Sequence, residues 1–425
     1  MVEKNSVIRQ SGLELMANEQ ESRELLLKSL NTSGMLFFAP NWVPRSFCIP
    51  GKRIKLHPND YYAFGAERGG VDERWFASTT AADNGPLTWE HEGLSAVVLG
   101  DGKAVLFRDA VQILGPELLG EKVWNEQKGW MMYSKFFDNQ EPLPHHVHQR
   151  LQHVQWEGKL GKPESYFFPT QVNNHGGDRP TTYFGLNPGV TKAQLRDCLA
   201  AFELGDNKLL TLSRAYELRP GTGWDVPAGI LHAPGSLCTY EPQRASDVFA
   251  MYQSVIEGRR VVPPELLWKD CPPEKIGDYD YLVDVLDWEA NVDPHFKENH
   301  YSEPKPVGDE AQMRQQGYVD NWVSYRSGDY TAKETTILPG QTVTLRDGAP
   351  YGFIVMQGYG TMGGRAIESP ALIRFGQLTR DEGFVSAQAA KDGIRVTNLS
   401  PVSELVMLRH YGPNNPDLKH ICSIN

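Results

Sequence analysis

Three short strings, far apart along the chain, restrict the fold more than any other feature. They are Pro144-His145-His146-Val147-His148, Gly161-Lys162-Pro163-Glu164 and Pro227-Ala228-Gly229-Ile230-Leu231-His232. His146 and His148 alternate, so on a strand both imidazoles point to the same face. In the third string, Pro and Gly favour a tight turn that delivers His232 to the start of the next strand. If the strands curl into a barrel, these groups can meet at its mouth.

The side chains of His146, His148, Glu164 and His232 form a candidate ligand set for a metal ion. Three nitrogens and one carboxylate suit zinc, with manganese, iron, cobalt and nickel as alternatives. The competing interpretation is that these are polar residues on a barrel rim, each satisfied by hydrogen bonds. His145 and His153 flank the set, and each is a candidate partner of a ligand or an alternative ligand.

Composition limits the class of protein. A chain of 425 residues is too long for one ordinary core, so two or more domains are expected. Its 40 glycines and 29 prolines favour many turns and short strands over long helices. The formal net charge of −11, without a basic run, argues against nucleic acid or an anionic membrane as the main partner. No apolar run is long enough to span a bilayer.

The five cysteines are scattered, with no C-x-x-C spacing, as Cys48, Cys198, Cys238, Cys271 and Cys422. They are interpreted as reduced thiols of a cytoplasmic protein. The first residues lack the apolar segment of a secretory signal.

The pattern along the chain predicts four regions. Residues 1–35 are expected to hold a helix, over 12–31, that packs on a barrel. Residues 36–258 form the metal-binding unit, with Thr191 as the N-cap of a helix and strands over Leu209–Leu218 and Asp247–Ile256. Residues 259–330 are a Pro-rich crossover with local elements. Residues 331–425 form a second barrel-like unit that we expect to be metal-free, because His410 and His420 are its histidines and neither has a metal partner nearby in sequence.

These strings resemble the cupin superfamily, and more narrowly type I mannose-6-phosphate isomerase across roughly residues 40–256. That family carries S-I-Q-V-H-P, then G-K-T-E-A-W, P-A-G-x-x-H-A and E-x-x-x-x-S-D-N-x-x-R. The matching stretches here begin at Pro144, Gly161, Pro227 and Glu241, and the segment 72–78 is similar to the family's G-E-x-W-x-x-S. The resemblance implies a mainly β fold of two cupin (jelly-roll) β-barrels with helical insertions, a bicupin with a metal site in the first barrel alone.

The resemblance also implies roles for residues. His146 stands where the family has a glutamine ligand, and His148, Glu164 and His232 stand at the other three ligand positions, with zinc as the family metal. Lys162 and Glu241 match polar residues that line the family's active site, which makes them candidate catalytic residues.

Two positions depart from the family pattern. Pro144 replaces a serine that helps to hold the substrate phosphate, and Met251 replaces the arginine that ends the last motif. Both changes put mannose 6-phosphate itself in doubt as the substrate. The basic residues considered as substitutes are Arg244, Arg214, Arg259 and Lys159.

The expected function is a metal-dependent aldose–ketose isomerase that acts on a sugar or sugar phosphate through an enediol. Glu241 is the candidate base and Lys162 its electrostatic partner or acid, and each has the alternative of a purely structural contact. Trp224 and Tyr166 are candidates for stacking on a sugar ring, the alternative being the core. Rival functions are another metal-dependent cupin reaction (oxygenase, lyase or epimerase) and a non-catalytic sugar-binding bicupin. The sequence leaves a homo-oligomer open.

Overall fold

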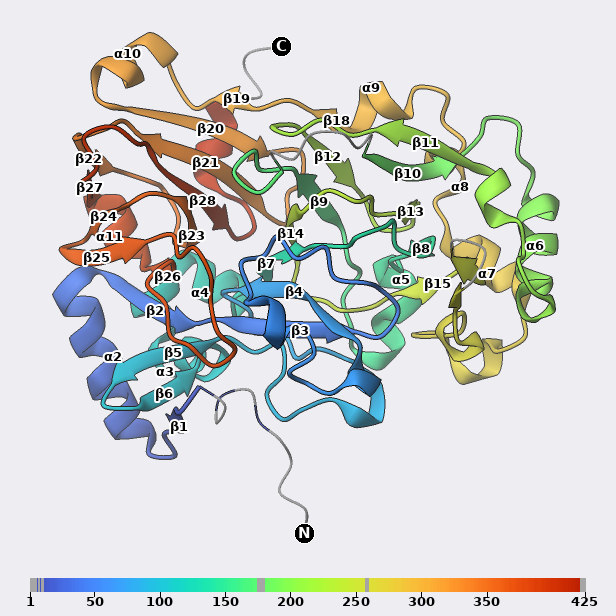
Figure 1. Ribbon diagram of the computed structural model, residues 1–425, viewed down its shortest axis with the longest axis horizontal. Coiled ribbons are helices and arrows are strands. Elements are labelled where there is room, and N and C mark those ends of the chain that lie inside the picture. The colour runs from blue at the N-terminus through green and yellow to red at the C-terminus, as the bar shows by residue number, and fades with distance from the viewer. Residues whose placement is uncertain (1–5, 7, 9–10, 174–179, 257–259, 421–425) are drawn as a thin grey trace.

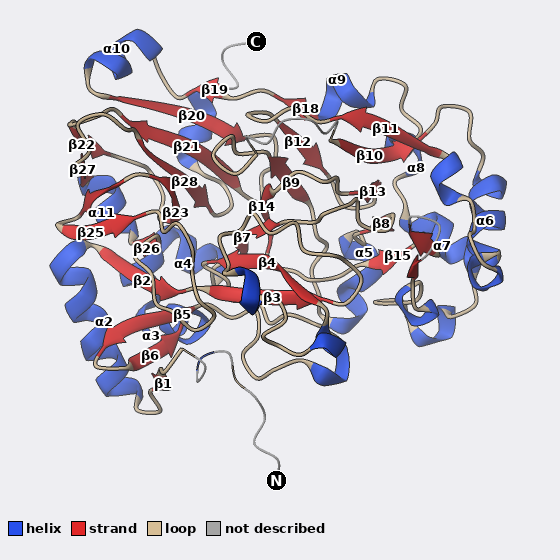
Figure 2. Ribbon diagram, in the orientation of Figure 1, coloured by secondary structure: helices blue, strands red, loops and turns tan. Residues whose placement is uncertain are grey.

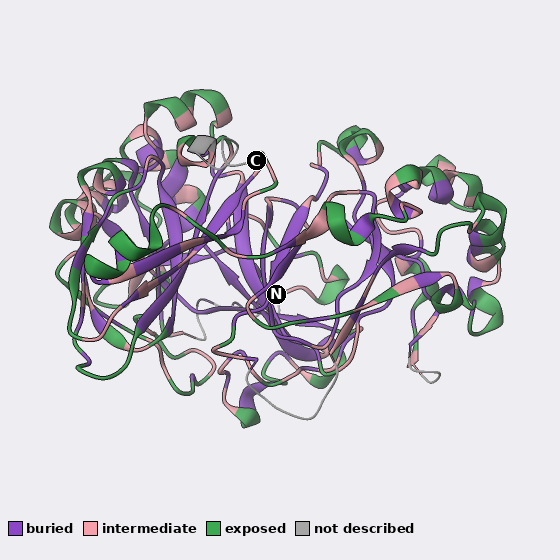
Figure 3. Cartoon of the chain, turned by 90° about the horizontal axis from the view of Figure 1, so that it is seen from above, coloured by how far each residue is buried: buried purple, intermediate pink, exposed green. Residues whose placement is uncertain are grey.

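The computed structural model describes residues 6, 8, 11–173, 180–256 and 260–420. The fold is mainly β, as predicted, with several sheets in the middle of the molecule and most of the helices around them (Figure 2). The strands are largely buried, and the exposed residues concentrate on peripheral helices and loops (Figure 3).

The first barrel is built from two sheets that face each other. Its seven-stranded sheet has, in spatial order, β18 (Tyr301–Ser302), β12 (Gly223–Val226), β9 (Glu164–Phe167), β14 (Thr239–Arg244), β7 (Met132–Phe137), β4 (Gly70–Phe76) and β3 (Asn41–Arg45). Its five-stranded sheet has β11 (Ser213–Glu217), β10 (Thr181–Leu186), β13 (Leu231–Ala233), β8 (His146–Val147) and β15 (Ala250–Met251). Phe137 and Tyr166 from the first sheet and Phe184 from the second belong to one buried apolar cluster.

The second barrel pairs part of a ten-stranded sheet with a four-stranded one. The large sheet has the order β1 (Glu14–Leu15), β6 (Lys103–Leu106), β5 (Ala96–Gly100), β2 (Met35–Ala39), β26 (Glu382–Val385), β23 (Tyr351–Gln357), β28 (Leu405–Tyr411), β21 (Thr331–Ile337), β20 (Tyr318–Ser324) and β19 (Lys305–Pro306). The small sheet has β22 (Thr342–Leu345), β27 (Ile394–Asn398), β24 (Tyr359–Met362) and β25 (Arg365–Glu368). Because β2 pairs with β26, the beginning of the chain extends a sheet built near its end (Figure 1).

The strands at the centre of the large sheet bury both faces. Side chains alternate along a strand, so Met407 of β28 enters the core of the second barrel while Leu408 points the other way. Leu408 there joins a cluster with Trp42, Phe136 and Tyr240 of the first barrel. The two barrels therefore share a continuous apolar contact.

The helices lie mainly at the edges of this β core. They are α2 (Glu19–Ser33), α3 (Phe107–Leu119), α4 (Glu121–Gln127), α5 (Leu151–Val154), α6 (Lys192–Ala200), α7 (Tyr279–Val285), α8 (Trp288–Asn291), α9 (Phe296–His300), α10 (Glu310–Gln315) and α11 (Ala387–Asp392). Among the described residues, none of the helices is both long and apolar enough to cross a membrane. The four cysteines within those residues are free thiols.

Local predictions succeed where a cap or turn defines the element. Thr191 caps α6 with a full capping box, as predicted. The N-terminal helix begins later than expected, at Glu19 with Asn18 as its N-cap, because residues 14–15 instead pair with β6. It ends at Gly34, whose φ of 73° is a left-handed conformation that glycine adopts without strain.

Two predicted strands are shorter than expected. The stretch 209–218 opens with a 3₁₀ turn (Leu209–Thr211) before β11, and 247–256 contains the two short strands β15 and β16 (Val255–Ile256). Apolar residues in both stretches are instead buried in a cluster beside α6 and α7. The apolar runs thus correctly indicated burial. The length of each strand depended instead on which adjacent strands supply hydrogen bonds to it.

Candidate metal centre

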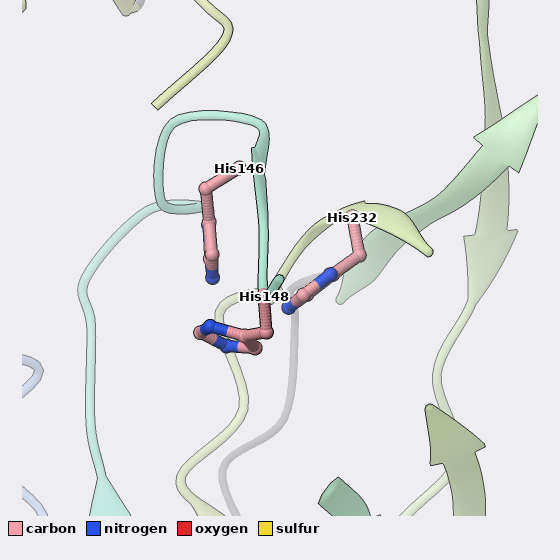
Figure 4. A group of neighbouring side chains, drawn as sticks. All are labelled: His146, His148 and His232. Carbon is pink, nitrogen blue, oxygen red and sulfur yellow. The ribbon is translucent and has the colours of Figure 1, made fainter. Parts of the chain in front are cut away.

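Three histidines meet between the two sheets of the first barrel. His146 on β8 is the direct cross-strand neighbour of His232 on β13, and His148 follows two residues after His146 on the same face. One ring nitrogen of each lies within 4.8 Å of those of the other two, and all three side chains are buried. Figure 4 shows the imidazoles turned toward a common space.

Backbone carbonyls set the tautomer of all three rings. The Nδ1 atoms of His146, His148 and His232 lie 2.8, 2.7 and 2.8 Å from the carbonyl oxygens of Pro144, Val248 and Ile230. A carbonyl oxygen only accepts hydrogen bonds, so each Nδ1 carries a proton, and Nε2 is the atom that bears the lone pair whenever the ring is neutral. Burial lowers the pKa of His146 well below its ordinary value and that of His148 to about 4, which keeps these two rings neutral.

Glu164 reaches this group from the facing sheet. One carboxylate oxygen lies 3.0 Å from Nε2 of His148 and the other 3.1 Å from Nε2 of His232. These distances bring lone-pair-bearing atoms together in a buried space. Oε2 of Glu164 and Nε2 of His232 also have no hydrogen-bond partner. The ammonium of Lys162 lies 3.3 Å from Oε2 of Glu164, but it leaves Nε2 of His232 without a partner. A further cation among these atoms would stabilise them, so the residues fit a metal ion of the zinc type.

A chain of buried charges extends from Glu164. The ammonium of Lys162 lies 3.3 Å from Glu164, 3.6 Å from Glu241 and 3.1 Å from Nε2 of His148. The ammonium of Lys135 lies 3.4 Å from the same oxygen of Glu241 and 3.3 Å from Glu73. Glu241 therefore stands between two lysines. Burial, helped by the negative charge of Glu164, raises the pKa of Glu241 to about 8 against the opposing effect of the lysines.

The chain of charges continues through a buried arginine to Asp247. Arg45 lies 3.2 Å from Glu73 and 2.9 Å from Asp247, and the indole of Trp75 donates to Glu73 over 2.7 Å. Opposite charges alternate from Glu164 to Asp247. The site is consequently a desolvated but paired cluster.

The sequence predictions omitted Lys135, although its pattern carried a signal. It is the one charged residue of β7, whose other residues are Met132, Tyr133, Ser134, Phe136 and Phe137. A lysine inside an otherwise buried strand is rare unless a carboxylate pairs with it. Asp247 had a signal, because it is the aspartate of the S-D-N motif that begins at Glu241, whereas Arg45 lies outside the matched motifs.

The structure separates the three predicted substrate-binding residues. Tyr166 lines the cavity beside the histidines, and its hydroxyl donates to Glu164. Trp224 packs instead in a buried aromatic cluster, with its ring centroid 4.9 Å from that of Phe184. Arg244 lies outside the set of residues lining that cavity, and its guanidinium is 3.5 Å from Asp329.

The other predicted residues also lie outside the charge cluster or outside the described residues. Arg214 donates to the backbone carbonyl of Asn291 over 3.2 Å, and Lys159 pairs with Asp270. Arg259 lies outside the described residues. Nδ1 of His145 is bonded to Gln253, and His145 is not part of the three-histidine group.

A small cavity connects the metal group with the charged side chains. Its volume is about 30 Å³, enough for a water molecule or two, which need roughly 10–15 Å³ each. Glu241, Lys135 and Lys162 line it together with His146 and His148. Met251, the strand neighbour of His146, also lines it, which places an apolar side chain at this wall. We call this space the metal chamber.

The proteins to which this chain is similar were found through their structures. No family model matches the chain, and no curated protein matches its sequence. Mannose 6-phosphate isomerase from Bacillus subtilis is similar with a TM-score of 0.55 and 14% identity, over 89% of this chain and 99% of that one. A histidine-to-glutamine mutant of phosphomannose isomerase from Salmonella typhimurium gives 0.58 and 13%, over 90% and 100%.

A zinc-bound mannose 6-phosphate isomerase gives a TM-score of 0.58 with 13% identity, again over 90% of this chain and 100% of that one. Identities this low establish similarity of the fold and leave the activity to be argued from the site. The chain has the cupin-like fold of the mannose-6-phosphate isomerases.

Proposed function

We propose that this protein is a metal-dependent aldose–ketose isomerase that acts on a sugar through an enediol. The observation that carries the proposal is the convergence of three buried histidine rings, each oriented by a backbone carbonyl bound to Nδ1. Nε2 of His148 and of His232 also lie 3.0 and 3.1 Å from the carboxylate of Glu164. The cupin-like fold shared with sugar isomerases supports the same reaction class.

His146, His148, Glu164 and His232 are the residues that would hold the metal, with zinc the first choice and manganese, iron, cobalt or nickel compatible with the same donors. When bound, the cation would polarise the carbonyl and hydroxyl oxygens of the open-chain sugar and lower the pKa of the carbon-bound proton. The hydrogen bonds to Pro144, Val248 and Ile230 keep the three imidazoles in the orientation that this role requires.

Glu241 is the proposed base. It is buried, lines the metal chamber and has two lysines within 3.6 Å of one of its oxygens. In the ionised form it can take the proton from C2 of the open-chain aldose, which gives the enediol, and return it to C1, which gives the ketose. Lys162 and Lys135 keep a positive charge beside it, which favours the carboxylate and stabilises negative charge on a substrate oxygen.

Proton exchange tests this proposal directly. The zinc- and manganese-loaded protein is incubated in D₂O with free and phosphorylated aldoses and ketoses, and loss of the C1 and C2 proton signals is followed by NMR. Exchange with at least one sugar, absent from His232→Ala and from chelator-treated protein, is the expected result.

No exchange with any sugar, while the metal remains bound, would refute the isomerase. The apolar Met251 at the chamber wall would then favour the second candidate, a metal-containing sugar-binding protein or a cupin enzyme with another reaction. Oxygen uptake by the iron-loaded protein would distinguish an oxygenase among those reactions.

A further inference from the structure

A much larger cavity lies next to the metal chamber. Its volume is about 430 Å³, within the range of roughly 300–1,000 Å³ typical of small-ligand pockets. Phe47 and Phe249 line both spaces, so the two cavities meet at this aromatic pair. The metal chamber alone holds a water molecule or two, and a substrate that reaches it must extend beyond it.

The lining at which the two cavities meet has the chemistry of a sugar-binding surface. The rings of Phe47 and Phe249 meet edge to face, with their centroids 5.8 Å apart. Leu87 and Leu266 continue the apolar lining, and Leu87 is 56% exposed although it lines a cavity. The C–H face of a pyranose packs on such a surface, while its hydroxyl groups remain available to polar neighbours.

The cations that line the larger cavity are already paired. Arg68 holds both oxygens of Glu92 at 2.8 Å, and Lys269 pairs with Asp83. Two further carboxylates, Glu67 and Glu265, are exposed on the same lining. The lining therefore has more carboxylates than cations, which disfavours a phosphate dianion and suits hydroxyl groups that donate hydrogen bonds.

The cations of the metal chamber are also already paired with carboxylates. Lys162, Lys135 and Arg45 are the cations of its lining, and each lies within 3.6 Å of a buried carboxylate. Binding a phosphate to any of them would break an existing buried pair and leave a carboxylate buried without its partner, which disfavours a phosphorylated ligand.

We propose that the larger cavity is a second sugar subsite and that the substrate is an uncharged oligosaccharide with a free reducing end. The C1–C2 end of the reducing-end unit reaches the metal chamber, and the rest of the oligosaccharide lies in the larger cavity against Phe47, Phe249 and Leu87. The reducing-end chemistry rests on the proposed isomerase function, whereas binding in the larger cavity requires no turnover.

Binding and turnover are measured separately to test this inference. Saturation-transfer NMR titrations with metal-free and zinc-loaded protein use cellobiose, maltose, β-1,4-mannobiose, glucose, mannose and mannose 6-phosphate as probes. We expect at least one disaccharide to bind at least tenfold more tightly than its monosaccharide, and mannose 6-phosphate to bind more weakly than mannose.

A matched pair of variants locates the subsite. Leu87→Trp fills the larger cavity and should weaken the preferred disaccharide at least tenfold. Leu204→Trp places the same side chain at another exposed leucine, outside the cavity lining, and should leave that affinity unchanged. Circular dichroism of both variants checks that they fold.

The outcomes separate the two proposals. Disaccharide binding that Leu87→Trp removes would support the subsite, even if no sugar exchanges protons in D₂O. Proton exchange with mannose 6-phosphate, without any disaccharide binding, would overturn the subsite and retain the isomerase. Equal affinity of both tryptophan variants, or no binding of any disaccharide, would also overturn it.

Discussion

Each barrel buries a cluster of polar and charged side chains between its sheets. The two clusters differ in how completely their atoms find hydrogen-bond or ion-pair partners. In the second barrel, Arg409 lies 2.5 Å from Asp347 and 2.8 Å from Asp320, and its Nε donates to Thr335 over 2.8 Å. Lys333 lies 2.7 Å from Asp347. Two cations and two anions thus balance within one closed network.

The cluster in the first barrel leaves lone-pair-bearing atoms without hydrogen-bond partners. Nε2 of His232 and Oε2 of Glu164 are buried and have no hydrogen bond, although the ammonium of Lys162 lies 3.3 Å from that oxygen. A buried network whose polar atoms are all paired has no free atom with which to bind a ligand. Converging lone pairs without partners can bind one. The difference supports the proposed roles, a structural one for the cluster around Arg409 and a ligand-binding one for the histidine group.

The largest expected effect is on the metal site. His232→Ala removes one of the converging nitrogens, and we expect zinc affinity to fall more than about 100-fold, because changes outside the ligand set already cost about 10–100-fold. Competition with a chromogenic chelator measures the affinity. His295→Ala, at an exposed histidine, is the control. Unchanged affinity in His232→Ala would remove the ligand assignment.

Glu241→Gln separates chemistry from metal binding. The substitution keeps the size of the side chain and removes its ability to take a proton, so proton exchange should fall about 10²–10⁴-fold. Zinc content, measured by elemental analysis, should remain at the wild-type value. A variant that keeps wild-type exchange would show that Glu241 has only a structural contact with the lysines.

Arg409→Met tests the second cluster. It leaves Asp320 and Asp347 buried without their main partner, which should lower the free energy of unfolding by about 3–5 kcal/mol. Denaturant unfolding measures this loss, and zinc affinity below the transition should not change. A loss under about 1 kcal/mol, or a parallel loss of zinc affinity, would contradict the separation of roles between the barrels.

The pH dependence of stability gives the smallest expected effect. Burial by itself would raise the pKa of Asp347, but Arg409 and Lys333 lower it to about 2 from its ordinary 3.8. A carboxyl with a lowered folded-state pKa contributes stability above its unfolded pKa and loses it as pH falls toward the folded one. The contribution, roughly 2 kcal/mol, should therefore disappear between about pH 4 and pH 2.

Asp347→Asn provides the comparison for that measurement. The wild-type protein should be the more stable of the two near neutral pH, and the difference in unfolding free energy should shrink as the pH approaches 2. A difference that stays constant with pH would show that ionisation of Asp347 does not stabilise the barrel.

Local chemistry determined much of the candidate site. The alternation of His146 and His148 places both rings on one face of any strand, because successive side chains of a strand point to opposite faces. Gly229, with a φ of 91°, forms the turn that precedes β13 and brings His232 opposite His146. These features act over a few residues, so they were predictable from the sequence.

Only the tertiary structure decided which distant charges meet. Lys135 joins Glu241 because β7 pairs with β14, and Lys333 joins Asp347 across the second barrel. Trp224 illustrates the converse, since nothing local distinguishes a tryptophan that packs on Phe184 from one that faces a ligand. Strand period and turn geometry are properties of neighbouring residues, whereas the pairing of charges depends on strand order and register, which the packing of the whole chain sets.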